Sequence, residues 1–171
     1  MSYEVEVQIE IPVGSRIKYE IDHNTGKLRV DRILHTPVYY FFNYGYIPNT
    51  LSGDGDPLDA IVLCNEKITP TAYITCKIVG VIKTWDESGE DDKMLLVPID
   101  KIDRDSSYIN NDNDLPEYKK QKLICFFEDY KKMEPGKWVK IDKDFKDRDE
   151  ALKIYKESLQ RYQDHLAEQT K

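Results

Sequence analysis

The chain has 171 residues, with 25 lysines and arginines against 32 aspartates and glutamates, and a formal net charge of −7. This acidic balance argues against nucleic acid or an anionic membrane as a main partner, because both select a basic protein face. No apolar run approaches the roughly 18 residues of a membrane span, and the first residues do not resemble a signal peptide.

Cysteine usage and length predict a single cytoplasmic domain. Cys64, Cys76 and Cys125 show no metal-ligand spacing. An odd number of cysteines is typical of free thiols in a reducing compartment, and we expect all three to be buried. A chain of this length can bury a core without disulfides, so we expect one domain over residues 1–171.

The first third of the chain has the period of β-strands. Residues 3–11 alternate between aliphatic and acidic or polar side chains, which predicts a strand with one solvated face. Residues 17–21 alternate in the same way. A turn at 22–26 and a return strand at 28–33, in which Arg29, Asp31 and Arg32 are embedded, predict a hairpin.

The middle of the chain is apolar and β-rich. Residues 37–48 are crowded with aromatic side chains and have no clear period, which is typical of core packing, although some tyrosine hydroxyls need polar partners. Residues 71–85 favour a long strand in which Gly80 indicates a bulge. Residues 94–99 return as another strand.

Helical patterns follow. Asp114 is placed to cap a helix that begins near Pro116. The apolar stripe of this helix is Leu123, Phe126, Phe127 and Tyr130. A short strand at 138–141 precedes a last helix that begins near Asp147. The pattern predicts an α+β fold in which short strands form a small barrel beside two helices.

Residues 54–59 carry the sharpest chemical signal. Asp54, Asp56 and Asp59 lie within this short turn, directly before a buried strand at 60–63. Clustered carboxylates repel one another, so the turn favours a hard divalent cation, although a solvated acidic turn is the plainer alternative. A calcium hand is excluded, because Leu58 stands where that loop needs an oxygen ligand.

A second acidic loop at 86–93 adds Asp86 and Asp91. If the two loops converge, their carboxylates suit magnesium, which can lower the pKa of a bound water. Several basic residues stand at element ends near these loops, namely Lys18, Arg32, Lys93 and Lys131. Each alone is typical of a surface charge, but together they indicate an anion held between cations and metals.

Six segments occur together in one order: 17–20, 30–32, 43–48, 54–60 (Asp-Gly-Asp-Pro-Leu-Asp-Ala), 89–93 and 126–131. On these segments the chain resembles the soluble family I inorganic pyrophosphatases of the compact bacterial type. The resemblance implies a five-stranded closed barrel of the oligonucleotide-binding (OB) type, with flanking hairpins and two main helices. It further implies hydrolysis of pyrophosphate to two phosphates with several Mg²⁺ ions, Mn²⁺ or Zn²⁺ as possible substitutes, and a homohexamer.

The resemblance also assigns roles to residues. The implied metal ligands are Asp54, Asp59, Asp86 and Asp91, with Glu10 and Glu20 acting mainly through waters or a late-arriving metal. The implied catalytic residues are Asp56 as general base, Tyr44 and Arg32. The implied substrate-binding residues are Lys18, Arg32, Tyr44, Lys93, Tyr130 and Lys131, with Tyr40 lining the site.

Two other functions stay open on sequence grounds. One is a non-enzymatic OB-type module that binds oligonucleotides, which the acidic balance disfavours. The other is a metal-dependent hydrolase of nucleotides or other phosphoesters, which would use the same acidic loops.

Overall fold

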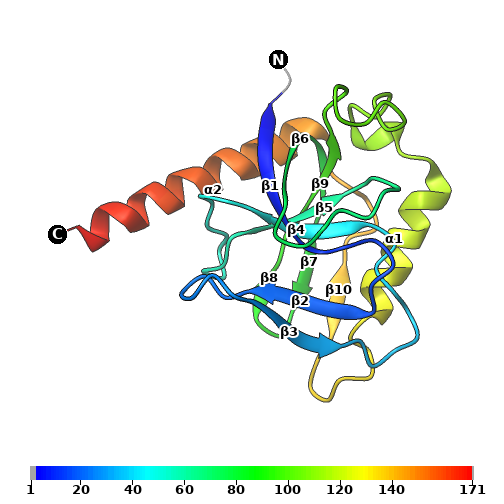
Figure 1. Cartoon of the computed structure of the whole chain (residues 1–171), viewed down its shortest axis with the longest axis horizontal. Helices are drawn as coiled ribbons and strands as arrows, with labels where there is room; N and C mark the ends of the chain where they lie inside the picture. Colours follow the sequence, from blue (N-terminus) through cyan, green and yellow to red (C-terminus); the bar gives the residue numbers. More distant parts are fainter. Residues whose placement is uncertain (1–2, 171) are drawn as a thin grey trace.

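The computed structural model describes residues 3–170, and within them five strands close into a barrel in the order β1-β4-β5-β9-β6 (Figure 1). These strands are β1 (Glu4–Ile11), β4 (Asn43–Ile47), β5 (Leu58–Val62), β6 (Tyr73–Ile82) and β9 (Lys93–Pro98). Neighbouring strands are antiparallel except β5 and β9, which pair in parallel. The predicted α+β class with a small closed barrel is confirmed.

Two small sheets extend the barrel. The predicted hairpin is present as β2 (Ile17–Ile21) paired with β3 (Leu28–Ile33), outside the barrel ladder. The second sheet has the order β10-β7-β8, where β7 is Thr84–Asp86, β8 is Gly89–Glu90 and β10 is Val139–Ile141. The β7–β8 hairpin therefore presents the second acidic loop.

Helix α1 (Glu117–Asp129) packs its predicted stripe into the core, where Leu123, Phe126 and Phe127 are buried. Helix α2 (Arg148–Gln169) begins after Asp147, whose carboxylate accepts a 2.9 Å hydrogen bond from the backbone of Glu150. Only the first half of α2 is buried against the barrel. The second half extends away from the body of the molecule (Figure 1). Within the described range, neither helix combines the length and apolarity that a membrane crossing requires.

Strand β9 shows how the two helices complete the core. All six of its residues are buried, because each face of the strand meets a different apolar cluster. Met94 and Leu96 share one cluster with residues of α2. Leu95 and Val97 point to the opposite face and share a cluster with residues of α1. The period of two along β9 therefore places the strand between the two helices.

Two local predictions were wrong. Asp114 does not cap α1, because its carboxylate accepts instead from the backbone amides of Asn110 (2.9 Å) and Asn111 (3.1 Å) in a short 3₁₀ turn, η1 (Asp112–Asp114). Cys125 is exposed rather than buried, since it lies off the apolar stripe of α1. Cys76 is buried as expected and Cys64 is partly buried.

The strand β4 was missed in the aromatic stretch. All five of its residues are buried, so it shows no alternation of apolar and polar side chains. Gly45 pairs with Ile9 of β1 in the barrel ladder. A Cβ atom there would lie 2.0 Å from the carbonyl oxygen of Gln8, so a side chain does not fit.

We predict that Gly45→Ala destabilises the protein by about 3 kcal/mol, because a backbone atom must move to admit the methyl group. Urea unfolding measures this difference. Gly53→Ala is the control, because a Cβ at Gly53 meets no atom within 4 Å. Equal losses for both variants would contradict the prediction.

Candidate active site

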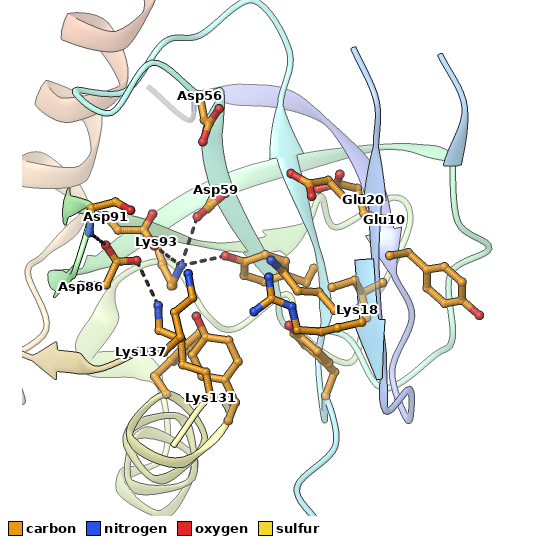
Figure 2. A pocket seen from close by; sticks show the side chains of 18 of the residues that line it. Glu10, Lys18, Glu20, Asp56, Asp59, Asp86, Asp91, Lys93, Lys131 and Lys137 are labelled. Atoms are coloured by element: carbon orange, nitrogen blue, oxygen red, sulfur yellow. Dashed lines mark hydrogen bonds and ion pairs between the residues drawn. The ribbon is translucent and has the colours of Figure 1, made fainter. Parts of the chain in front are cut away.

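A cavity of about 370 Å³ opens between the β2–β3 hairpin, the two acidic loops and the end of α1 (Figure 2). The sequence-predicted site residues that line it are Glu10, Lys18, Glu20, Arg32, Tyr40, Tyr44, Asp54, Asp56, Asp59, Asp86, Asp91, Lys93, Tyr130 and Lys131. The structure therefore brings together every residue that the sequence analysis placed in the site.

Sequence analysis did not place six residues of the wall in the site. Three are the apolar or aromatic Ile11, Tyr19 and Phe127, and the others are Glu87, Ser88 and Lys137. The carboxylate of Glu87 lies 3.0 Å from the ammonium of Lys137. Glu87 and Ser88 directly follow Asp86 in the acidic loop, so their position in the sequence could have identified them as site residues. Lys137 lies after a Pro-Gly turn, and no spacing or motif in the sequence marks it.

The acidic turn, residues 52–59, is fixed by its own backbone. The amide of Ser52 donates to the carbonyl of Asp56 at 2.8 Å, and Gly55 adopts a φ of +91°, which favours glycine. The carboxylate of Asp54 accepts from the Ser52 hydroxyl and, at 3.0 Å, from the backbone of Asp56. The turn thus holds Asp54 and Asp56 at the rim of the cavity, while Asp59 lies on β5.

Helix α2 holds the base of this turn from outside. The amide of Leu51 donates to the carbonyl of Ser158 at 3.0 Å, and Arg161 donates to the carbonyl of Leu51 at 2.7 Å. On the inner side, the hydroxyl of Thr50 accepts from the amide of Leu58 at 3.0 Å. Both ends of the acidic turn are therefore attached to regular structure.

Lys93 lies at the centre of the cavity wall, only 3 % exposed (Figure 2). Its ammonium donates to Asp91 at 2.9 Å, to Asp59 at 3.1 Å and to the hydroxyl of Tyr44 at 2.9 Å. Asp59 and Lys93 are partners in the parallel β5–β9 ladder, which explains their proximity. Burial lowers the pKa of Lys93, but the groups around it outweigh that effect and hold it well above the ordinary value.

The acidic residues of the cavity fit a hard divalent cation. Burial and then the neighbouring charge of Asp91 raise the pKa of Asp59, although the contact with Lys93 lowers it. An all-oxygen donor set of this kind suits magnesium. Over residues 3–170, however, no three acidic, histidine or cysteine side chains already converge on one point, because the carboxylates contact lysines instead.

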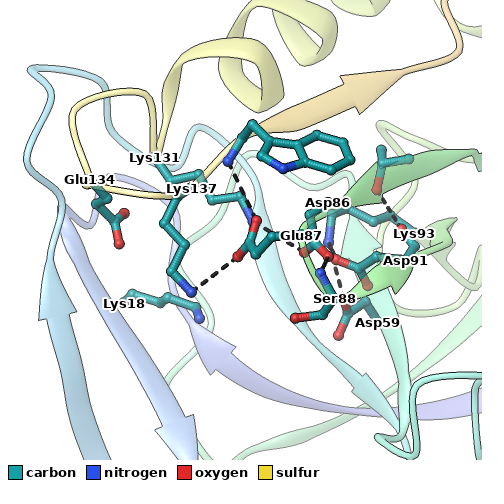
Figure 3. Close-up of polar contacts among 12 residues, drawn as sticks. Lys18, Asp59, Asp86, Glu87, Ser88, Asp91, Lys93, Lys131, Glu134 and Lys137 are labelled. Carbon is teal, nitrogen blue, oxygen red and sulfur yellow. Dashed lines mark hydrogen bonds and ion pairs between the residues drawn. The ribbon is translucent and has the colours of Figure 1, made fainter.

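The other basic side chains of the cavity also form ion pairs with carboxylates. Lys131 lies 3.1 Å from Asp86 and 3.6 Å from Glu87 (Figure 3). Across the cavity, Lys18 lies 3.3 Å from Asp31, which also pairs with Arg32 at 2.8 Å. Arginine and lysine arranged on two walls of a cavity are suited to binding a compact anion such as a phosphate.

Asp56 lies among other negatively charged side chains of the cavity. Partial burial and the negative charges of Asp54 and Glu20 raise its pKa above the ordinary value, which brings it closer to neutral pH. No lysine or arginine contacts its carboxylate within the described chain, unlike the carboxylates of Asp59, Asp86 and Asp91.

Glu10 is the most deeply buried acid of the first strand. One carboxylate oxygen accepts a 2.8 Å hydrogen bond from the amide of Ile21, which ties the β2–β3 hairpin to the barrel. Burial raises the pKa of Glu10 from 4.5 to about 7. The folded protein therefore binds this proton more tightly than the unfolded chain does, and the resulting stabilisation is lost as the pH rises toward 7.

We predict that Glu10→Gln becomes more stable than the native chain as the pH rises from 4.5 to about 8, by about 2 kcal/mol, because glutamine cannot ionise. Urea unfolding in a chelator at both pH values measures the change. Glu4→Gln, on the exposed part of the same strand, is the control. A difference that does not vary with pH would rule the idea out.

Comparisons with known proteins give consistent matches over most of the chain. Residues 7–163 match the family model described as inorganic pyrophosphatase. The chain is 43 % identical to the inorganic pyrophosphatase of Aquifex pyrophilus over 93 % of this chain and 89 % of that one. It is 51 % identical to that of Saccharolobus solfataricus over 81 % and 80 % of the two chains. The solved inorganic pyrophosphatase of Helicobacter pylori superposes with a TM-score of 0.91 at 42 % identity, covering 94 % of each chain.

Proposed function

Because the chain belongs to the inorganic pyrophosphatase family, which hydrolyses pyrophosphate, we propose that it does so with Mg²⁺ and with Asp56 as the general base. The supporting observation is that both acidic loops and five basic side chains line one cavity. Pyrophosphate is a small, densely charged anion, and its hydrolysis needs a positioned water and charge neutralisation on the leaving phosphate.

The metal ligands in this proposal are Asp54, Asp59, Asp86 and Asp91, with Glu10 and Glu20 contributing through waters. Bound there, magnesium supplies positive charge to the phosphate oxygens and lowers the pKa of water. Mn²⁺ or Zn²⁺ are possible substitutes, because they accept the same oxygen ligands.

The protein's own side chains orient the substrate. Lys18 and Arg32 bind pyrophosphate from the β2–β3 hairpin. Lys93 and Lys131 bind it from the opposite wall, together with the hydroxyls of Tyr44 and Tyr130. Burial raises the pKa of Tyr130 to about 12, so its hydroxyl stays protonated and can donate a hydrogen bond to a phosphate oxygen.

Asp56 accepts the proton of the attacking water at a carboxylate oxygen, consistent with its raised pKa and its freedom from lysine contacts. Tyr44, whose hydroxyl accepts a 2.9 Å hydrogen bond from Lys93, lines the same cavity as Asp56.

We also propose a cytoplasmic, one-domain homo-oligomer, with a hexamer expected. The exposed ring of Tyr118 on α1 and the exposed Leu166 on α2 support association, because they offer apolar surface on both helices. Sedimentation velocity of the purified protein tests the oligomeric state.

The proposal predicts phosphate release from pyrophosphate by the purified protein with magnesium, and loss of that release on chelation. Nucleoside triphosphates serve as comparison substrates, because a general phosphoester hydrolase would use them equally well. A folded protein that releases no phosphate from magnesium pyrophosphate would contradict the proposal, and salt-sensitive binding of single-stranded nucleic acid would then favour a binding module.

Two isosteric variants separate the proton acceptor from the metal ligands. Asp56→Asn is expected to lower turnover by roughly 100-fold or more, with little change in magnesium affinity. Asp59→Asn is expected to raise the magnesium concentration at half-maximal activity by roughly tenfold or more. Turnover of Asp56→Asn and magnesium titrations of both variants measure this, and near-native turnover of Asp56→Asn would exclude its role as base.

A further inference from the structure

Glu134 is a buried acid just outside the cavity. It lies in the turn after α1, on the segment that also carries Lys131 and Lys137 (Figure 3). The residue is 8 % exposed, one carboxylate oxygen accepts from Nη1 of Arg32, and the other is buried without a hydrogen-bond partner among the described residues. A charge held this far from water is costly unless it is paired, so its burial depends on Arg32.

Arg32 is held from two sides. Its Nε donates to Asp31, its neighbour on β3, at 2.8 Å, and its Nη1 donates to Glu134. Its Nη2 donates no hydrogen bond to any residue of the described chain. Two carboxylates therefore fix the plane of the guanidinium and leave one nitrogen for another acceptor.

The ion pair also joins two separate walls. Arg32 belongs to the β2–β3 hairpin, which lies outside the barrel ladder, whereas Glu134 belongs to the turn after α1. Arg32 lines the cavity and Glu134 does not, so the carboxylate of Glu134 acts on the cavity through Arg32.

We infer that Glu134 is a positioning residue for pyrophosphate binding. It orients the guanidinium of Arg32 toward the substrate and keeps the hairpin against the turn that carries Lys131. This inference rests on the proposed function, in which Arg32 binds the substrate. An arginine fixed in this way loses less side-chain entropy when it binds a phosphate than a free arginine does.

Glu134→Gln tests the inference, because glutamine keeps the shape and one acceptor oxygen but removes the charge. We expect kcat/KM for magnesium pyrophosphate to fall by about tenfold, mainly through a higher KM, as is typical of a lost charge-assisted hydrogen bond. Asp129→Asn is the matched control, since Asp129 is an exposed acid at the end of α1 whose partner is the exposed Lys132. The control is expected to keep native kinetics.

A double-mutant cycle separates positioning from a general structural role. On an Arg32→Ala background, Glu134→Gln is expected to lower kcat/KM by less than about twofold, because there is no guanidinium left to orient. An equal loss on both backgrounds would show that Glu134 acts through the fold and would overturn the inference, as would native kinetics of Glu134→Gln alone. An inactive native protein would instead reject the proposed function.

If Glu134→Gln does not fold, Glu134→Asp replaces it in the same cycle, because aspartate keeps the charge and shortens the reach. Thermal unfolding of each variant identifies the folded ones. Non-additivity with Arg32→Ala is again the expected result, and additivity again overturns the inference.

Discussion

The rest of the site depends on the contacts that the ammonium group of Lys93 makes. It joins Asp59 of the first acidic turn, Asp91 of the second acidic loop and the hydroxyl of Tyr44 on β4. Without a cation at this point, two carboxylates would face each other in a partly buried site and one of them would have to be protonated. The parallel pairing of β5 with β9 creates the contact, because it sets Asp59 opposite Lys93.

The same principle extends around the cavity. Lys131 forms an ion pair with Asp86, and Lys18 forms one with Asp31. Arg32 forms ion pairs with both Asp31 and Glu134. The chain is acidic overall, but its binding cavity alternates the two signs over short distances. A ligand that enters must replace these internal pairs with stronger ones. A compact polyanion together with divalent cations can do so, because it offers opposite charges to both sets of side chains.

The sequence predicted those parts in which one local signal dominates. Strand β1 has alternating faces over most of its length, β2 and β3 are joined by a recognisable turn, and the acidic turn is recognisable from its composition. Strand β4 was not predicted, because both of its faces are buried and its sequence therefore shows no alternation of apolar and polar side chains. The error at Asp114 arose because a carboxylate near a helix start can bind the preceding turn as well as the helix. Lys137 and Glu134 could not be found, since their importance comes from partners far away in the chain.

The attachment of the acidic turn to α2 links the start of the site to the end of the chain. The backbone amide of Leu51 donates to the carbonyl of Ser158, and the carbonyl of Leu51 accepts from Arg161, two residues of α2. A nascent chain can therefore form the β2–β3 hairpin early, but these anchors of the acidic turn are made only after most of α2 has left the ribosome. Incomplete chains that end before Ser158 thus lack this support for the acidic turn.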